Sequence, residues 1–168
     1  MNDEPKPKID GCSVDELRLL ARNLGFNDLK VTGPTPQTWG HFLEWLQNRY
    51  HGEMHYLSRR AAERSDPSAL LPSVRSILIV TKAYPFAIPP IPDSSPLLPG
   101  IISRYAWGED YHEIMAEGLQ KLVDSIHSST QGRHQARWVV DTAPILEKDF
   151  AAQSGIGWIG KHTNLLNR

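Results

Sequence analysis

The sequence predicts an α/β protein, an α+β sandwich in which helices flank a short mixed sheet. Three observations support this class. Apolar residues recur at helical spacing in several segments, an apolar run at 76–82 is typical of a strand, and glycines and prolines separate these segments. With 168 residues and 40% hydrophobic content, the chain is long enough for one domain with its own core.

The N-terminal part of this pattern begins with a helix and a strand. Ser13 and Glu16 form a capping-box pattern ahead of apolar residues at helical spacing, and Gly25 is placed to end the helix. A short strand is expected at 27–32, and a proline-containing turn at 33–36.

The middle of the chain predicts helical segments, then strands around a proline-rich loop. One helix has an apolar face, and a polar helical stretch with three arginines follows; the face is formed by Trp39, Phe42, Leu43 and Leu46. Ser76–Lys82 is expected to be a strand buried in the sheet, because its apolar residues are consecutive. The proline-rich stretch 84–100 is expected to be an irregular surface loop, and 101–105 another short strand.

A long helix is expected from Asp110 onward. Its apolar residues lie four, three and four positions apart, at Met115, Leu119, Leu122 and Ile126. A polar linker follows, then a short strand at 137–140 that ends at Asp141.

The last expected helix leads into a glycine-rich segment. Thr142 can cap this helix, Pro144 would lie in its first turn, and Gly155 would close it. Residues 155–160 match the dinucleotide pattern G-x-G-x-x-G and, with the lysine that follows, nearly match a P-loop. Both patterns require a strand before the glycines, and here a helix precedes them. We therefore interpret the segment as a tight turn that lets backbone pack closely.

The composition narrows the class of protein. A net charge of −1 gives no overall attraction to nucleic acid, so any RNA contact would need a local basic patch. The one cysteine, Cys12, cannot form an internal disulfide or hold an iron–sulfur cluster by itself, and a cytoplasmic location fits this usage. No signal peptide or membrane span is expected, and residues 1–12 are expected to be a disordered lead-in.

His51 and His55 raise the possibility of a metal site. On one helical face, two histidines four positions apart could bind zinc, as in a zinc hydrolase. The metalloprotease pattern requires a glutamate directly after the first histidine, and Glu53 lies one position late. Two solvated histidines are the favoured interpretation, and no metal ligand is assigned.

Two places in the sequence carry residues suited to chemistry. The stretch 103–112 is dense in polar and aromatic residues just before a helix, where ligand sites are common. Asp141 lies between a strand end and a helix start, and two roles remain open for it. It could cap the helix, whose N–H groups favour the carboxylate, or it could donate a proton if burial beside a large apolar ligand favours the acid form.

Four stretches, taken together, resemble one enzyme family. They are, in order, YHGEM at 50–54, LLP at 70–72, SRYAWGEDYH at 103–112, and VVDTAPILEKDFAAQSGIGWIGKHTNLLN at 139–167. Several ordered motifs of this length are far more specific than any single pattern above, and the likeness extends over nearly all of the chain from Val14. The sequence resembles epoxyqueuosine reductase, the last enzyme in making the queuosine base of certain transfer RNAs.

The resemblance implies a cobalamin-dependent oxidoreductase with two four-iron (4Fe–4S) clusters. This family reduces the epoxide of epoxyqueuosine in the tRNA anticodon loop to an alkene, and an aspartate protonates the departing oxygen. Asp141 matches that aspartate. By the same resemblance, the cobalamin would be lined by Arg64, Ser103, Asp141 and Leu165, with Tyr105, Lys161 and His162 as neighbours. Lys161 would meet a phosphate of the cofactor or of the tRNA, unless it is a solvated surface lysine.

The sequence also departs from the family pattern. The cysteine runs that bind the clusters would follow Arg168, so 13–168 is expected to be a cobalamin-binding domain, incomplete at its C-terminal end and without the iron–sulfur domain. The proline-rich 84–99 loop is individual to this sequence. We therefore expect this chain alone to be inactive. The alternative is a truncated, non-catalytic module that binds a corrinoid or a partner, and no electron donor is indicated.

Overall fold

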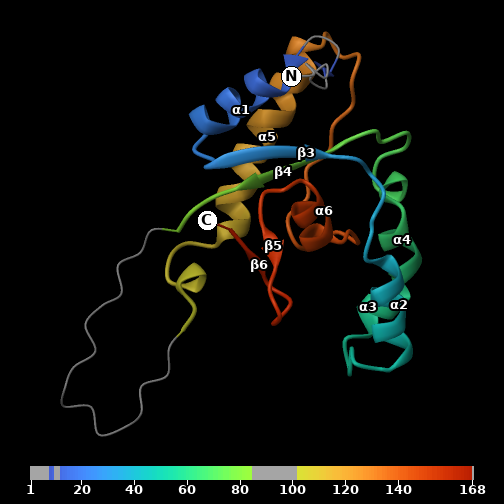
Figure 1. Cartoon of the computed structure of the whole chain (residues 1–168). Coiled ribbons are helices and arrows are strands. Elements are labelled where there is room, and N and C mark those ends of the chain that lie inside the picture. Colours follow the sequence, from blue (N-terminus) through green and yellow to red (C-terminus); the bar gives the residue numbers. More distant parts are fainter. Residues whose placement is uncertain (1–7, 10–11, 85–101, 168) are drawn as a thin grey trace, which may run out of the picture.

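A computed structural model describes residues 8–9, 12–84 and 102–167. At its centre, β3 (Asp28–Thr32) pairs antiparallel with β4 (Ile77–Thr81), with Asp28 opposite Thr81 and Thr32 opposite Ile77. In Figure 1, helix α1 lies above this strand pair, and helix α6 and the hairpin β5–β6 lie below it. The α/β class with short strands flanked by helices is confirmed. The mixed sheet is not, because the described strands form separate two-stranded antiparallel pairs.

The main core lies between the strand pair and two helices, α1 (Val14–Asn23) and α5 (Tyr111–Ser129). Its buried members are Leu17, Ala21, Phe26, Leu29, Leu122 and Ile126. Gly118 of α5 faces the Phe26 ring so closely that a Cβ there would lie 2.8 Å from Phe26 Cζ. The long helix α5 therefore packs against Phe26 through a position that needs a small residue.

Helix α1 confirms the capping-box prediction. Ser13 Oγ accepts from the Glu16 amide at 3.2 Å, and Glu16 Oε2 accepts from the Ser13 amide at 2.6 Å. Gly25 follows the helix with φ +86°, the left-handed conformation expected at such an end. Two short strands, β1 (Lys8–Ile9) and β2 (Cys12–Ser13), pair within the stretch predicted as a lead-in, and the other residues of 1–12 lie outside the described residues.

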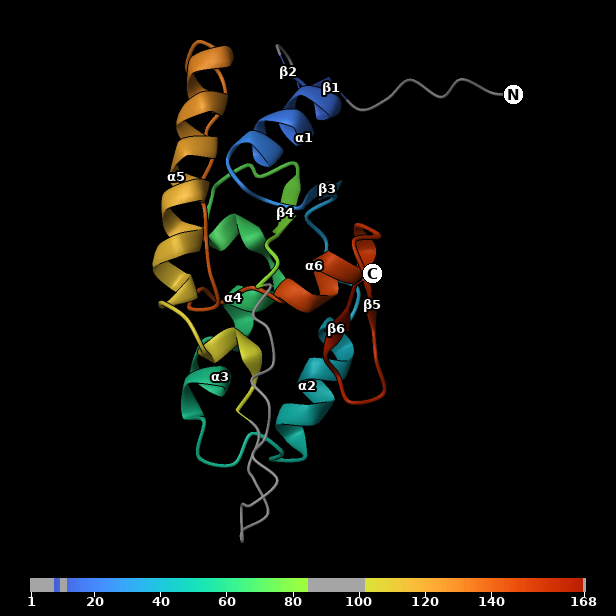
Figure 2. The ribbon, with the colours of Figure 1, turned by 90° about the vertical axis from the view of Figure 1, so that its left-hand side faces the viewer.

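Three helices extend beyond one end of the strand pair (Figure 2). They are α2 (Trp39–Gln47), α3 (His55–Arg59) and α4 (Ala61–Ser65), followed by a 3₁₀ turn at Pro67–Ala69. The start of α2 is held from a distance, because buried Asp149 Oδ2 accepts from the Gln37 amide at 2.7 Å and the Thr38 amide at 3.1 Å. This carboxylate ties α2 to helix α6 (Glu147–Gln153).

Two strand predictions in the middle of the chain need correction. The strand predicted at Ser76–Lys82 is present as β4, but it is half-buried rather than buried, since β3 is its one partner among the described strands and a cavity lies beside it. The strand predicted at 101–105 is wrong for its described part, where Arg104–Ala106 forms a 3₁₀ turn. The loop predicted at 84–100 lies outside the described residues, apart from Tyr84.

The region before α6 also differs from expectation. The long helix from Asp110 is confirmed as α5, with Asp110 as its N-cap. The prediction of a strand at 137–140 is wrong, because this segment pairs with no described strand. Side-chain hydrogen bonds hold it instead. Arg137 Nη1 donates to Leu70 O at 2.9 Å, and Trp138 Nε1 donates to Gln120 Oε1 at 2.8 Å.

Helix α6 begins later than predicted. Its N-cap is Leu146, so Thr142 does not cap it and Pro144 lies in the bends before it. The physical reason is the turn at Asp141, whose φ of +52° redirects the chain before a helix can start. The predicted end is confirmed, with Ser154 as C-cap and Gly155 at φ +73°.

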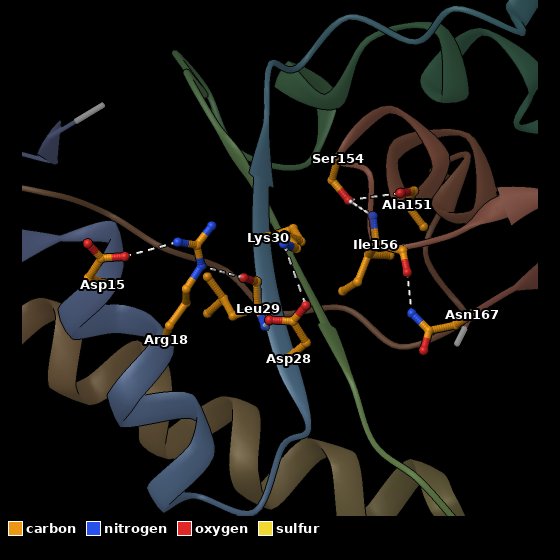
Figure 3. Close-up of polar contacts among 9 residues, drawn as sticks. All are labelled: Asp15, Arg18, Asp28, Leu29, Lys30, Ala151, Ser154, Ile156 and Asn167. Atoms are coloured by element: carbon orange, nitrogen blue, oxygen red, sulfur yellow. Dashed lines mark hydrogen bonds and ion pairs between the residues drawn. The ribbon is translucent and has the colours of Figure 1, made fainter. Parts of the chain in front are cut away.

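The glycine-rich segment forms the hairpin of β5 (Trp158–Ile159) and β6 (Leu165–Leu166). A Cβ at Gly157 would overlap the Leu166 carbonyl, which confirms the prediction of closely packed backbone. A helix precedes these glycines and a strand follows them, the reverse of a dinucleotide fingerprint. Figure 3 shows the connection: Ser154 Oγ bonds Ala151 O, and Asn167 Nδ2 donates to Ile156 O.

Candidate active site

Asp141 lies at the turn between the extended stretch 137–140 and helix α6. Its side chain is half exposed, and the residue lines a large cavity. The helix begins six residues later with Leu146 as its N-cap, so Asp141 does not act as a helix cap. The structure therefore excludes one of the two roles that the sequence left open for this carboxylate.

Two residues from the start of α5 hold the Asp141 carboxylate. The Tyr111 hydroxyl donates to Asp141 Oδ2, and His112 Nε2 lies 3.7 Å from the same oxygen. The hydrogen bond to Asp141 is the main cause that raises the pKa of Tyr111 to about 12, because a phenolate beside a carboxylate is unfavourable. Tyr111 therefore remains a donor at all physiological pH values.

His112 lies between two carboxylates. Its Nδ1 is 2.8 Å from Asp110 Oδ1, and its Nε2 faces Asp141. The Asp110 carboxylate also accepts from the His112 amide at 2.9 Å, and these bonds lower the pKa of Asp110. An imidazolium at this position would donate toward both carboxylates.

The aromatic rings at this end of α5 pack together. Tyr111 stacks on His112 with ring centroids 4.1 Å apart, and Tyr105 meets Tyr111 edge to face at 5.9 Å. Tyr105 is 53% exposed, so its free face is open to the cavity that it lines. The packing fixes the ring that bonds Asp141.

Glu147 contacts Asp141 from the other side. As the first residue of α6, it accepts a hydrogen bond from the Asp141 amide at 2.9 Å through Oε1. Burial is the largest cause that raises the pKa of Glu147 to about 7, and the neighbouring Asp141 carboxyl adds to it. At neutral pH, this carboxyl group is therefore divided between its neutral and charged forms.

These residues border one large cavity of about 1490 Å³, the central cavity. It runs along β4 and most of the length of α5, and most of its lining is apolar. Ordinary small-molecule pockets measure about 300–1,000 Å³. The central cavity thus has room for a larger, mostly apolar group, with Tyr105, Tyr111, Asp141, Glu147 and Leu165 among its lining residues.

Comparisons with known proteins agree on one family. The family model described as "Epoxyqueuosine reductase QueG, DUF1730" matches residues 64–142. Curated epoxyqueuosine reductases also match, among them one from Pseudomonas aeruginosa that is 34% identical over 98% of this chain. The chain belongs to the epoxyqueuosine reductase family. It spans about half the length of the curated relatives that it matches, with 48% of the P. aeruginosa protein covered.

Solved epoxyqueuosine reductases share the fold. A selenomethionine-labelled crystal structure matches with a TM-score of 0.70 and 27% identity, over 91% of this chain and 41% of that chain. Another, solved with an epoxyqueuosine-modified tRNA stem loop, matches with a TM-score of 0.68 and 27% identity, over 91% of this chain and 40% of that chain.

The residues that the family resemblance selected divide into two groups. Tyr105, Asp141 and Leu165 line the central cavity, and the structure brings them together although they are far apart in sequence. Arg64 and Ser103 lie outside its lining. Ser103 is exposed at the start of the 3₁₀ turn, where its carbonyl accepts from the Ala106 amide at 3.0 Å.

Arg64, a residue of α4, is buried against α2. Its Nη1 donates to Arg60 O at 3.1 Å, and its guanidinium lies 5.9 Å from the centroid of the Phe42 ring. Burial lowers the pKa of Arg64. In this structure, the side chain thus serves the packing of the helices beyond the strand pair.

Lys161 and His162 lie in the turn between β5 and β6. Both side chains are exposed and outside the lining of the central cavity. The His162 ring covers Gly160, where a Cβ would lie 2.6 Å from His162 Cε1. Leu165, on the next strand, is the residue of this hairpin that borders the central cavity.

The zinc alternative finds no third ligand. The His51 and His55 rings meet edge to face with centroids 6.2 Å apart. In the described part of the chain, no group of three or more histidine, cysteine, aspartate or glutamate residues is placed to hold a metal ion. Nor do these residues include a helix long and apolar enough to cross a membrane.

Two residues of the site escaped the sequence analysis. Tyr111 stood within the polar and aromatic stretch but was not selected from it, and Glu147 was not selected at all. The position of Tyr111 at a helix start was a usable signal. Glu147 had none, because its contact with Asp141 depends on a left-handed turn that the sequence does not reveal.

Proposed function

We propose that this chain is the cobalamin-binding part of an epoxyqueuosine reductase, an oxidoreductase of queuosine biosynthesis that converts epoxyqueuosine to queuosine in tRNA. The observation that carries the proposal is the placement of Asp141, held by Tyr111 at the edge of a large apolar cavity in a chain of this family. Residues 13–168 form this cobalamin-binding domain, and the two four-iron clusters belong to a separate domain that supplies its own cysteines.

The central cavity suits a corrinoid in size and character. Its volume of about 1490 Å³ and mostly apolar lining match a broad macrocycle with an apolar face. Tyr105, Leu165 and Asp141 would border the bound cofactor. The chemistry that cobalamin would supply here, when bound, is reduction. The other residues that the resemblance selected would contact the cofactor only at its periphery or after rearrangement. They are Arg64, Ser103, Lys161 and His162.

The protein's own chemical contribution is proton delivery by Asp141. An alkoxide leaves poorly, so protonation of the departing epoxide oxygen speeds its loss, typically by about 10²–10⁴-fold. Tyr111 and His112 both engage Oδ2 of the Asp141 carboxyl group. A bound cofactor that covers the cavity would exclude water and favour the protonated acid.

The substrate would be a tRNA anticodon loop that carries epoxyqueuosine. A relative was solved with an epoxyqueuosine-modified tRNA stem loop, which supports this partner. The net charge of −1 requires the phosphate contacts to be local, and Lys161 in the exposed β5–β6 turn is one candidate. A tRNA-modifying enzyme of this kind would work in the cytoplasm.

The test is Asp141→Asn in the full-length enzyme. The variant should keep cobalamin binding, measured by visible absorption, and should lose epoxide reduction by about 10²-fold or more, measured on a modified stem loop. Asn retains the size and the acceptor oxygen of Asp but cannot donate the proton. Near-normal turnover of the variant would refute the acid role.

A further inference from the structure

The turn that carries Asp141 is held from two helices. Its φ of +52° lies in the left-handed region, which L residues adopt at an energetic cost, although aspartate tolerates it better than most. Such a turn persists when the surrounding structure fixes it. Tyr111 of α5 holds the Asp141 side chain, and Glu147 of α6 holds the Asp141 backbone amide.

Helix α6 is a firm support for the second of these contacts. Phe150 and Ala151 are buried, with exposed fractions of 0% and 5%. The Asp149 carboxylate binds two amides at the start of α2, so the first turn of α6 is fastened to a distant element. Glu147, at the start of that turn, therefore presents its carboxyl oxygen from a fixed position.

We propose that Glu147 is a positioning residue for Asp141: its carboxyl group fixes the backbone of the Asp141 turn from helix α6 and so keeps the Asp141 side chain at the edge of the central cavity. This inference rests on the proposed role of Asp141 as the proton donor. Glu147 itself acts through the amide 2.9 Å from its Oε1.

The ionisation of Glu147 suits this role. Burial raises its pKa to about 7, and Asp141 and His112 are the titratable groups that face it. A neutral carboxyl still offers a carbonyl oxygen to the Asp141 amide, and it adds no second negative charge beside the Asp141 carboxyl. The backbone contact therefore survives protonation, while the electrostatic repulsion between the two acids is reduced.

A pair of variants in the 168-residue chain tests the backbone contact. Glu147→Ala removes the acceptor and should speed hydrogen exchange of the Asp141 amide by about tenfold, measured by NMR. Glu147→Gln keeps an acceptor oxygen of the same reach and should stay within about threefold of the parent. Glu113→Ala, an exposed change on α5, is the matched control and should leave the Asp141 amide unaffected. Parent-like exchange in Glu147→Ala would overturn the proposal.

The same two variants in the full-length enzyme test the consequence for turnover. Glu147→Ala should lower kcat by about tenfold or more with cobalamin affinity and KM nearly unchanged, and Glu147→Gln should restore most of kcat. If Glu147→Gln loses as much turnover as Asp141→Asn, Glu147 is itself a proton donor and the positioning role is refuted. If Asp141→Asn turns over normally, the proposed acid role of Asp141 fails, whatever the amide exchange shows.

Discussion

At the scale of single residues, the site depends on the contacts among four ionisable side chains. Asp141 is engaged by Tyr111 and His112 on one side and by Glu147 on the other. Tyr111 and His112 lie in the first turn of α5, and Glu147 lies in the first turn of α6. From these positions their side chains contact the turn at Asp141. Of these groups, Glu147 has a raised pKa that lies near neutral pH.

The stability of the fold should therefore depend on pH through Glu147. Its pKa in the folded chain is about 7, above the ordinary value of 4.5. A raised pKa means that the folded state holds the proton more tightly. The resulting stabilisation is complete below about pH 4.5 and is lost as the pH rises through 7. Glu147→Gln should remove this loss.

Urea denaturation at pH 5 and pH 8.5 measures the effect. Relative to the parent, Glu147→Gln should gain about 1–3 kcal/mol in free energy of unfolding between the lower and the higher pH. Glu44→Gln, an exposed change on α2, should show no such pH-dependent difference. Parallel behaviour of Glu147→Gln and the parent at both pH values would argue against a raised pKa at this position.

At the scale of secondary-structure elements, the contact between α6 and α2 is the most consequential single tie. Asp149 is buried, and its Oδ2 accepts from the Gln37 and Thr38 amides. Asp149→Ala would remove two partly buried hydrogen bonds to a charged acceptor, which should lower the free energy of unfolding by about 1–3 kcal/mol. Asp149→Asn keeps an acceptor oxygen and should lose less.

Chemical denaturation checks this prediction, and amide exchange localises it. The Gln37 and Thr38 amides should lose protection in Asp149→Ala, because α2 would fray from its start. Asp124→Ala, on the exposed face of α5, is the surface control and should stay within about 0.5 kcal/mol of the parent. A loss in Asp149→Ala no larger than in the control would show that the tie contributes little.

The elements differ in how much the sequence revealed. Helices α1 and α5 were predictable because their signals are local: a capping box, an N-cap and apolar residues at helical spacing. The strands expected at 101–105 and 137–140 failed because a strand requires a partner, which no local pattern supplies. Helix α6 was predicted to start too early, because Thr142 and Pro144 are good helix-start residues that the turn at Asp141 overrides.

The site shows the same division between local and non-local information. Asp141 could be singled out because it lies at a junction between elements, and the family motifs selected Tyr105 and Leu165, which also reach the central cavity. The contacts of Asp141 with Tyr111 and Glu147 span 30 and 6 residues and depend on the turn geometry. Periodicity and spacing carry no information about such contacts.

At the scale of the whole molecule, the central cavity is lined by β4, by α5 and by helix α6. Among the described strands, β4 pairs with β3 alone, so the other edge of β4 is not covered by a strand of this part of the chain. Solved relatives that match this chain over 91% of its length are more than twice as long.

This geometry predicts weak cobalamin binding by the 168-residue chain, with a dissociation constant above about 1 μM. A cofactor beside the edge of β4 that no described strand covers would keep part of its surface in water, and each Å² of apolar surface left in water forfeits about 25 cal/mol. Titration followed by visible absorption gives the constant. Leu165→Ala, which alters the cavity lining, should weaken binding further, whereas Leu166→Ala on the same strand should not. If binding is submicromolar and Leu165→Ala does not change it, the corrinoid binds elsewhere. If binding is submicromolar and Leu165→Ala weakens it, the described residues already form a complete pocket.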